Sequence, residues 1–404
     1  MENIQSRSRS FNLRVPLLLS FIISDVAADN YVFRHLHDSS TGYIWAILGF
    51  LLLEIIAAPI QSGFSDFTYR KKSLIVALSS TIVSLLCVFL FHQNLLVMWL
   101  TILLIYISKA CLGNTTPMSW AGIADTQTRN FRFSLGLSTG AFAFGYFLLI
   151  LINKVFGVAD SSLVLIGIFV ILIILCKKYF FDFADIPRTA KESSEVPKTG
   201  RLHHLMIREF ILIFHELRQG RTRLALITFF LWEISLYSIH MLDVDFHLPQ
   251  FANLTTAMVL GYFLGVAILK LLEKIADKNM IRLGYWVCIL SVFIVIIFYF
   301  IFGYSRVFVL SCYFFYNLGT AFLAPSLFAI LSKERKPHEQ GKIYGLIDST
   351  DTVAFLLSAI AVITYNYLRL SPIYIISFSF IVFVVSWLPY ARFEKIPRVS
   401  RASS

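Results

Sequence analysis

Long apolar runs separated by short polar breaks occupy most of the chain. A helix that crosses a bilayer needs about 20 apolar residues, and the pattern predicts twelve such helices. Their expected ranges are 13–33, 43–63, 73–91, 95–122, 133–153, 160–180, 223–243, 251–271, 284–302, 306–331, 343–364 and 371–391. The composition agrees, since 57% of the 404 residues are hydrophobic and 15% are charged, whereas a soluble domain is about one quarter charged. We therefore expect an all-α polytopic membrane protein.

One long polar stretch divides the twelve predicted spans into two groups of six. This stretch is rich in Lys, Arg, Glu, Ser and Pro, and LMIREFILIFHELRQ near its end has the spacing of an amphipathic helix. We expect it to be a linker with an interfacial helix. The predicted domains are the cytoplasmic N-terminal tail 1–12, the six-helix bundle 13–180, the linker 181–222, the six-helix bundle 223–391 and the cytoplasmic C-terminal tail 392–404.

The basic residues orient the predicted spans. With the N-terminus inside, 29 of the 35 Lys and Arg residues fall on the cytoplasmic side and 4 on the opposite side, while the other two lie inside spans. The positive-inside rule therefore places both termini in the cytoplasm. The first apolar run lacks a small-residue cleavage site, so we expect it to be a retained span. The net charge of +11 follows this distribution, and no nucleic-acid-binding module accompanies it. We expect a monomer in a bacterial inner (plasma) membrane that binds no nucleic acid.

Two polar loops recur at nearly the same interval. The loop SGFSDFTYRKK follows the second span and contains Asp66, and EKIADKNMIR follows the eighth span and contains Asp277, 211 residues later. Gly136, near the start of the fifth span, and Gly345, near the start of the eleventh, are 209 residues apart. Two independent intervals of almost equal length indicate that one six-helix unit has been duplicated in parallel. For such a pair of halves we expect a site between them near the bilayer midplane.

In these features the chain resembles the major facilitator superfamily of secondary transporters over about residues 13–391. The family's loop between spans two and three reads Gly-x-x-x-Asp-Arg-x-Gly-Arg-Arg. In this sequence Asp66, Arg70 and Lys71 match that motif, while Ser62 stands for the first glycine. The family's pattern Arg-x-x-Gln-Gly in span four is present as KACLG, which keeps a basic residue and the glycine. The resemblance implies the fold of the superfamily, with twelve helices in two parallel six-helix halves.

The resemblance also implies a gate on the cytoplasmic side. In the family, the loop acid and its basic neighbours link spans two and three to the start of span eleven and favour the outward-facing state. The predicted gating residues are Asp66, Arg70, Lys71, Asp277, Arg282 and Asp348. For the basic residues of the loop, the alternative is that they are only topology charges. Asp348 shares a helix face with Asp351 at the start of span eleven, where the helix N-terminus itself would stabilise both carboxylates.

Ionisable residues inside the predicted spans are candidates for the transport site. A charged side chain at the bilayer centre costs at least about 2.5–3.5 kcal/mol, so it faces a cavity or a partner. Asp25 and Asp29 lie one turn apart on one face of span one, and Lys109 is the basic residue at similar depth. The predicted substrate- or proton-binding residues are Asp25, Asp29, Glu54, Lys109, Asn114, Glu233 and Asn317. The alternative is a structural ion pair that fixes helix packing.

The sequence carries no motif of an enzyme or of an ATP-driven pump. Gly341 and Lys342 lack the upstream glycine and the following Ser or Thr of a phosphate-binding loop, and neither a nucleophile elbow nor HExxH occurs. The five cysteines form no CxxC pair. We therefore expect no catalytic site, no metal and no cofactor, and an ion gradient as the energy source.

The predicted function is proton-coupled secondary active transport of a small polar organic solute by alternating access. Protonatable acids beside a lysine suit coupling to protons, since a carboxylate removed from water binds a proton more readily. Drug–proton antiporters of the family carry Gly-Pro-x-x-Gly-Gly in span five, whereas FSLGLSTGAFAFGYFL contains no proline, which favours uptake by symport. Proton-driven efflux of a drug or metabolite is the alternative, and a non-transporting sensor or lipid-handling protein is a third. The expected partners are the solute, a proton and the lipid bilayer.

Overall fold

The computed structural model describes most of the chain as helix. The described residues are 2–38, 43–67, 70–91, 98–125, 131–157, 160–180, 217–218, 220–240, 248–303, 305–335, 339–368 and 372–396. Within these ranges every regular element is helical. The predicted interfacial helix lies outside them, apart from Leu217 and Arg218.

Twelve helical segments correspond to the twelve predicted spans. In the first half they are α1 (Glu2–Asp38), α2 (Tyr43–Phe67), α3 (Arg70–Phe91), the interrupted segment α4 (Met98–Ile105), η1 (Tyr106–Cys111) and α5 (Thr116–Asp125), then α6 (Phe131–Phe156) and α7 (Ser161–Tyr179). In the second half they are α10 (Gly220–His240), α11 (Leu248–Leu271), α12 (Asp277–Phe302), α13 (Arg306–Lys333), α14 (Gln340–Tyr367) and α15 (Pro372–Lys395). Among the described residues, ten helices are long and apolar enough to cross a membrane, and α11 contributes a shorter apolar stretch. The prediction of an all-α polytopic fold is confirmed.

The segment predicted as one continuous span at 95–122 is interrupted. The π-helix η1 is followed by four residues outside any helix before α5 begins at Thr116. Gly113 lies in this break, where a Cβ atom would come within 2.8 Å of a carbonyl oxygen of η1. The hydroxyl of Thr81 on α3 donates to the Gly113 carbonyl at 3.2 Å. Pro117 stands in the first turn of α5, where its missing amide proton removes no intrahelical hydrogen bond. The break therefore leaves backbone donors free for side chains from other helices.

Packing divides the chain into two compact units. Unit 1 consists of Met1–Gln127, Leu148–His215 and Pro337–Ser349, and unit 2 of Thr128–Phe147, Glu216–Lys336 and Thr350–Ser404. Two helices contribute to both units, since the first part of α6 belongs to unit 2 and the first part of α14 to unit 1. The predicted bundles follow the repeat along the sequence, and their boundaries stay a prediction.

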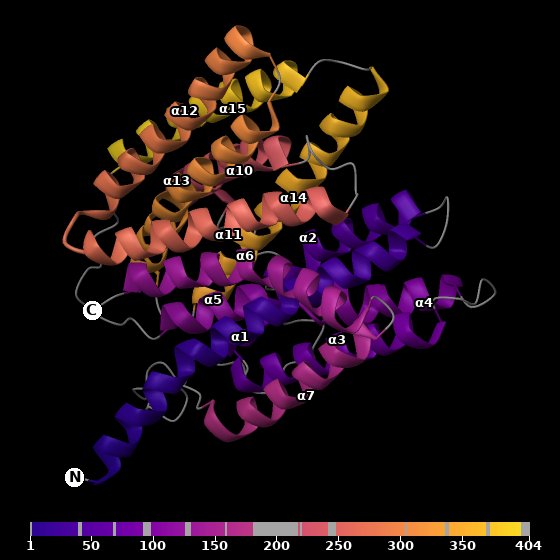
Figure 1. Cartoon of the computed structure of the whole chain (residues 1–404). Helices are drawn as coiled ribbons and strands as arrows, with labels where there is room; N and C mark the ends of the chain where they lie inside the picture. Colours follow the sequence, from indigo (N-terminus) through magenta and orange to yellow (C-terminus); the bar gives the residue numbers. More distant parts are fainter. Residues whose placement is uncertain are drawn as a thin grey trace. The chain divides into compact units, whose positions relative to one another are not determined.

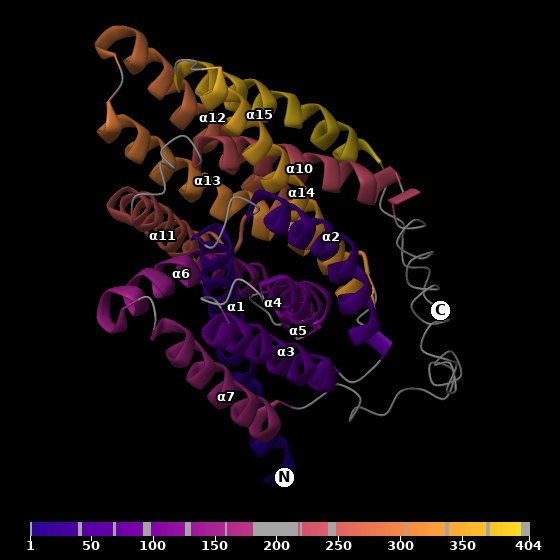
Figure 2. The same ribbon diagram turned by 90° about the vertical axis from the view of Figure 1, so that its right-hand side faces the viewer.

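In unit 1, helix α1 is held from two sides. It packs against α5 and α7, and α7 also packs along α3, as Figure 1 and Figure 2 show. Leu18, Phe21 and Ile22 of α1 are fully buried, and Leu18 reaches Gly122 of α5, where a Cβ atom would lie 3.1 Å from it. This packing buries the face of α1 next to the two acidic residues.

In unit 2, small residues let the helices approach closely. The main pairs are α12 with α13, α11 with α13, and α10 with α15. A Cβ atom at Gly319 would lie 2.9 Å from the carbonyl oxygen of Gly284, and one at Gly261 would lie 2.4 Å from that of Phe314. Such contacts are typical of helices packed in a membrane, where small residues bring backbones together.

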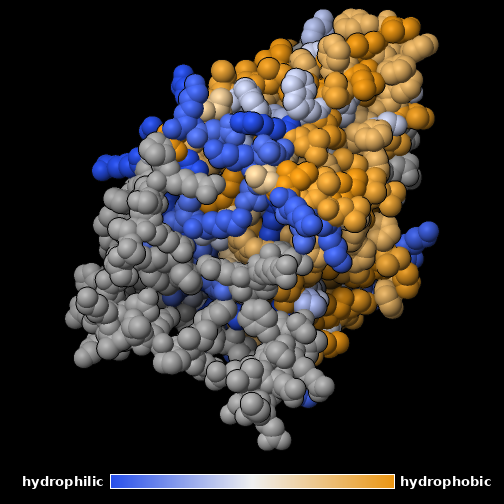
Figure 3. All heavy atoms as spheres, turned by 90° about the vertical axis from the view of Figure 1, so that its left-hand side faces the viewer, coloured by the Kyte–Doolittle hydropathy of each residue, from blue (hydrophilic) through white to orange (hydrophobic). Residues whose placement is uncertain are grey.

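Large apolar side chains cover much of the outer surface of these helices. Trp286 on α12 is 63% exposed and Phe300 is 74% exposed, and Figure 3 shows a broad hydrophobic area on one face. Exposed apolar surface on this scale fits contact with lipid rather than water.

Candidate functional site

Lys109 of η1 is held by both acidic residues of α1. Its ammonium contacts the Asp25 carboxylate and lies 2.9 Å from Oδ1 of Asp29. The second oxygen of Asp25 accepts hydrogen bonds from the amides of Thr115 and Thr116 and from the Thr116 hydroxyl, each at 2.9 Å. Asp25 therefore closes the N-terminal end of α5 as a cap supplied by another helix.

The two acids of α1 differ in how they are satisfied. The side chain of Asp25 is 1% exposed and receives hydrogen bonds at both oxygens. The side chain of Asp29 is 21% exposed, and Lys109 is its ion-pair partner. Lys109 also donates to the carbonyl of Gly113 in the break, at 3.3 Å. Two side chains thus stabilise the break in span four. Asp25 accepts hydrogen bonds from the amides at the start of α5, and Lys109 donates to the Gly113 carbonyl just after η1.

A second pair of acids lies beside this arrangement. The side-chain amide of Asn114, also in the break, donates to Asp348 of α14 at 2.8 Å and lies 3.4 Å from Oε1 of Glu54 on α2. Glu54 interacts electrostatically with Asp29, Asp348 and Lys109. We call the group the unit 1 acid cluster; its members are Asp25, Asp29, Glu54, Lys109, Asn114 and Asp348.

Unit 2 contains a separate pair of acids. Glu233 on α10 is buried, Asp351 on α14 is partly buried, and the two interact electrostatically. The hydroxyl of Tyr237 donates to Asp351 at 2.9 and 3.0 Å. The predicted residue Asn317 is fully buried on α13, and its amide donates to the Tyr313 carbonyl at 2.6 Å, while its Oδ1 has no hydrogen-bond partner among the described residues.

The predicted gating acid Asp66 binds the start of α14. Its two oxygens accept hydrogen bonds from the amides of Gly341 at 2.9 Å and Lys342 at 3.1 Å. Arg70 pairs with Asp66 at 2.8 Å and with Asp125, at the end of α5, at 2.7 Å. A carboxylate at a helix N-terminus is stabilised by the helix dipole, so the contact joins α2 to α14 within unit 1.

The other predicted gating residues have different partners. Lys71 donates to the carbonyl of Lys177 at the end of α7. Asp277 begins α12 and pairs with Arg132 at 3.0 Å and Lys333 at 2.7 Å. Arg282 pairs instead with Glu394 of α15, at 3.0 Å. Asp348 belongs to the unit 1 acid cluster. The gating roles of these residues stay predictions.

A model of the Major Facilitator Superfamily matches residues 15–359 of the sequence. The chain belongs to the Major Facilitator Superfamily (MFS). It is therefore a multi-pass integral membrane protein of a transporter family, as the resemblance in the loop after span two implied. No curated protein sequence matches the chain.

Solved structures of other MFS transporters are similar to this one. The human organic anion transporter MFSD10 superposes with a TM-score of 0.69 at 12% identity, covering 94% of this chain and 99% of its own. The E. coli fucose:proton symporter FucP gives 0.69 at 12% identity, covering 96% and 100%. The proton:xylose symporter XylE gives 0.67 at 13% identity, covering 97% and 96%. At these identities the similarity shows the shared fold alone.

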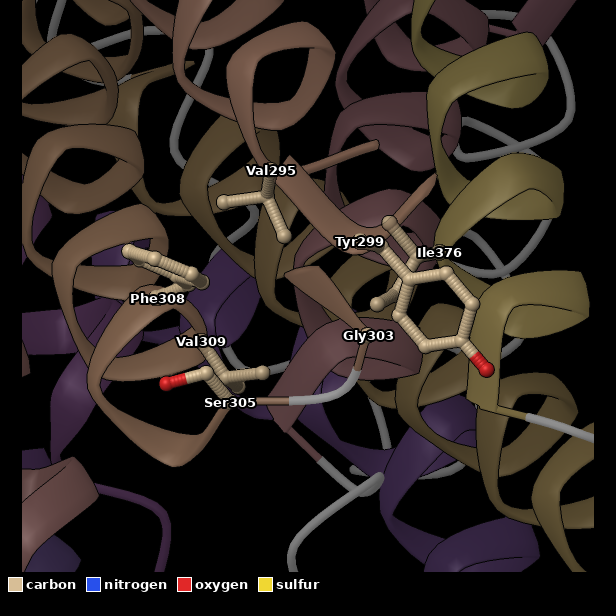
Figure 4. A pocket seen from close by; sticks show the side chains of 7 residues that line it. All are labelled: Val295, Tyr299, Gly303, Ser305, Phe308, Val309 and Ile376. Carbon is tan, nitrogen blue, oxygen red and sulfur yellow. The ribbon is translucent and has the colours of Figure 1, made fainter. Parts of the chain in front are cut away.

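One small pocket in this MFS transporter lies away from the charged groups. It lies where α12, α13 and α15 meet, and Figure 4 shows Val295, Phe308 and Ile376 around it. No carboxylate, lysine or arginine lines it. In the described part of the chain, no group of three or more His, Cys, Asp or Glu side chains could hold a metal ion. The candidate transport sites are therefore the unit 1 acid cluster and the pair Glu233 and Asp351 of unit 2.

Two residues of the candidate sites could not be recognised from the sequence. Arg132 reads as one of several loop charges, and its contact with Asp277 depends on tertiary packing. Asp351 shares a helix face with Asp348, but Asp348 belongs to unit 1 and Asp351 to unit 2. The i, i+3 spacing would have led to the opposite interpretation, that both acids act together.

Proposed function

We propose that this MFS transporter is a proton-coupled symporter that takes up a small polar organic solute. The observation that carries the proposal is the sharing of one ammonium, that of Lys109, between the carboxylates of Asp25 and Asp29. A cation held by two anions changes its partner when one of them is neutralised. Binding of a proton to one of these carboxylates therefore changes the ion pair that Lys109 makes.

Asp29 is the proposed proton acceptor of the pair. A proton on Asp29 removes one of the two charges that hold Lys109, whereas Asp25 remains bound to the N-terminal amides of α5. The ammonium then stays with Asp25, and the protonated Asp29 side chain becomes free to bind a polar group of the solute. Loss of the proton restores the ion pair and expels that group.

The charge balance of the unit 1 acid cluster bears on the solute. The cluster contains four carboxyl groups and one ammonium. An excess of carboxyl groups repels an anion, so a neutral or cationic polar solute is expected. FucP and XylE are sugar–proton symporters by their descriptions, which agrees with the proposal, whereas the description of MFSD10 as an organic anion transporter does not fit this charge balance.

Export remains the second candidate function. The same exchange at Lys109 would drive efflux if the solute and the proton competed for Asp29. The absence of proline from span five separates this chain from the pattern of drug–proton antiporters, so we favour uptake.

Purified protein in proteoliposomes tests the proposal. Neutral sugars, amino acids, amines and organic anions are offered while a pH-sensitive dye inside the vesicles reports proton entry. We expect a solute-dependent acidification that Asp29→Asn abolishes while solute exchange without a gradient persists, because the amide mimics the protonated acid. Accumulation that follows a sodium gradient and ignores the pH gradient would exclude proton coupling. Proton exit on solute entry would establish antiport.

A further inference from the structure

Glu233 and Asp351, which we call the unit 2 acid pair, have no basic partner. The two carboxyl groups interact with each other, and the hydroxyl of Tyr237 donates to Asp351. No lysine, arginine or backbone N–H group of the described residues contacts either acid. In the unit 1 acid cluster, by contrast, the ammonium of Lys109 balances part of the negative charge. The unit 2 acid pair therefore lacks a counter-charge within the described part of the chain.

Tyrosine side chains lie around Glu233. Its carboxyl group interacts electrostatically with the phenol groups of Tyr262 on α11 and of Tyr313 and Tyr316 on α13. Glu233 is 7% exposed, and the three tyrosines are buried as well. All four residues belong to unit 2. The acid is therefore screened from water by aromatic groups of two neighbouring helices.

A further acceptor without a partner lies beside these tyrosines. Asn317 on α13 is fully buried, and its Oδ1 has no hydrogen-bond partner among the described residues. The amide group of Asn317 interacts with the phenol of Tyr313, which also interacts with Glu233. A buried acceptor without a donor is costly, and in a native structure it indicates a missing ligand, ion or water. Asn317 therefore points to a ligand in this part of unit 2 independently of the acids.

These groups require both a positive charge and hydrogen-bond donors. A buried carboxylate in a membrane protein needs a partner of opposite charge or a proton. One proton would neutralise one acid of the pair, but it would leave the other acid and Oδ1 of Asn317 unsatisfied. A protonated primary amine supplies a positive charge and three N–H donors, and aromatic rings also attract a cation. An organic ammonium ion therefore fits the site better than a proton alone.

We propose that the unit 2 acid pair binds the ammonium group of an organic amine, and hence that the transported solute is a cation. Glu233 supplies negative charge, Tyr237 orients Asp351, and Oδ1 of Asn317 accepts a hydrogen bond from the amine or from a polar group attached to it. Because the site is buried in the conformation described here, the amine enters when alternating access opens the site to one side of the membrane.

This inference rests on the proposed transport function, because only a transporter carries the bound amine across the membrane. It narrows the solute from a neutral or cationic molecule to a cationic one. Binding of the amine does not depend on the proton at Asp29, which belongs to unit 1. Amine binding can therefore be measured without a proton gradient.

Glu394 on α15 provides the matched control. It also accepts a hydrogen bond from a tyrosine, Tyr390, at 3.0 Å, but it pairs with Arg282 at 3.0 Å. The charge of Glu394 is thus balanced within the chain, whereas that of the unit 2 acid pair is not. Glu394→Gln should leave amine binding unchanged.

The test measures binding to purified full-length protein by isothermal titration calorimetry at pH 7. The probes are ethylamine, cyclohexylamine and phenethylamine, which are all protonated at this pH. Ethanol, cyclohexanol and 2-phenylethanol have similar shapes without the charge, and sodium chloride tests for an inorganic cation. The wild-type protein is compared with Glu233→Gln, Asp351→Asn and Glu394→Gln.

We expect at least one amine to bind about tenfold or more tightly than its alcohol, because hydrogen bonds to charged groups are stronger than neutral ones by about this factor. Glu233→Gln and Asp351→Asn should each remove that difference, and Glu394→Gln should keep it. If one of the two site variants fails to fold, the other decides.

Three results would overturn the inference: equal affinity for amines and alcohols, amine binding that survives in Glu233→Gln and Asp351→Asn or is lost equally in Glu394→Gln, and sodium binding as tight as that of the amines. Proton-coupled uptake of a neutral sugar by a protein that binds no amine would refute this inference and leave proton coupling intact. Amine binding without proton entry would refute proton coupling and support the site.

Discussion

Replacing each acid of α1 by its amide should affect folding very differently at the two positions. In Asp25→Asn, a single oxygen remains to accept hydrogen bonds from Thr115, Thr116 and Lys109. The new NH₂ group is itself a donor and faces at least one of these donors. Lys109 keeps its contact with Asp29, but each buried donor of the break that loses its acceptor costs about 1–3 kcal/mol, in addition to the loss of the closer ion pair. Asp25→Asn should therefore destabilise the protein by about 3–5 kcal/mol.

Asp29→Asn is the matched variant, one helical turn away. It removes one contact to Lys109 from a side chain that is 21% exposed, and Lys109 keeps Asp25. The expected cost is about 1–2 kcal/mol, between the values for exposed and for buried charge pairs. The variant should fold and keep the break in span four.

Thermal unfolding with a thiol-reactive dye compares the two variants directly. Cys87, Cys176, Cys288 and Cys312 are buried and report loss of the folded state, whereas Cys111 is partly exposed and is replaced by Ser in all the proteins compared. The melting temperature of Asp25→Asn should lie well below that of Asp29→Asn. Equal melting temperatures, or a larger loss in Asp29→Asn, would refute the assignment of Asp25 as the cap of α5 and return it to the candidates for proton coupling.

Three more tests concern glycine packing, the Lys109–Asp29 pair and the membrane topology. Gly341→Ala should lower the melting temperature by the equivalent of about 1–3 kcal/mol, because its Cβ would lie 2.1 Å from a carbonyl oxygen of α2; Gly140→Ala, with no atom within 4 Å of its Cβ, should be neutral, and equal losses would contradict the packing. Lys109→Met should destabilise strongly, and adding Asp29→Asn should recover part of the loss; additive losses in this double-mutant cycle would show that the two residues do not interact. A phosphatase that is active only outside the cytoplasm should be inactive when fused after Ser404, and an active fusion would reverse the predicted topology.

Features that depend on local composition and period were predictable from the sequence. Apolar runs of membrane-spanning length predict helices because no other open structure satisfies the backbone in lipid, and the structure confirms a helix at each of them. The cost of a charge in the bilayer singled out Asp25, Asp29 and Lys109, which the structure brings together. The family was evident from the loop around Asp66 and from the repeat.

The partners of these groups, by contrast, became visible in the folded chain and could not be predicted from local pattern. The break in span four has no signal in the apolar pattern, because its free amides are satisfied by Asp25 on another helix. Asp348 and Asp351 share a helix face but pack in different units. In the sequence Arg132 looks like one of several loop charges, and its contact with the end of α11 is visible only in the folded chain. A local pattern records the burial and spacing of a residue. Its partner is decided by packing between segments that are distant in the chain, and a single sequence does not contain that information in any local form.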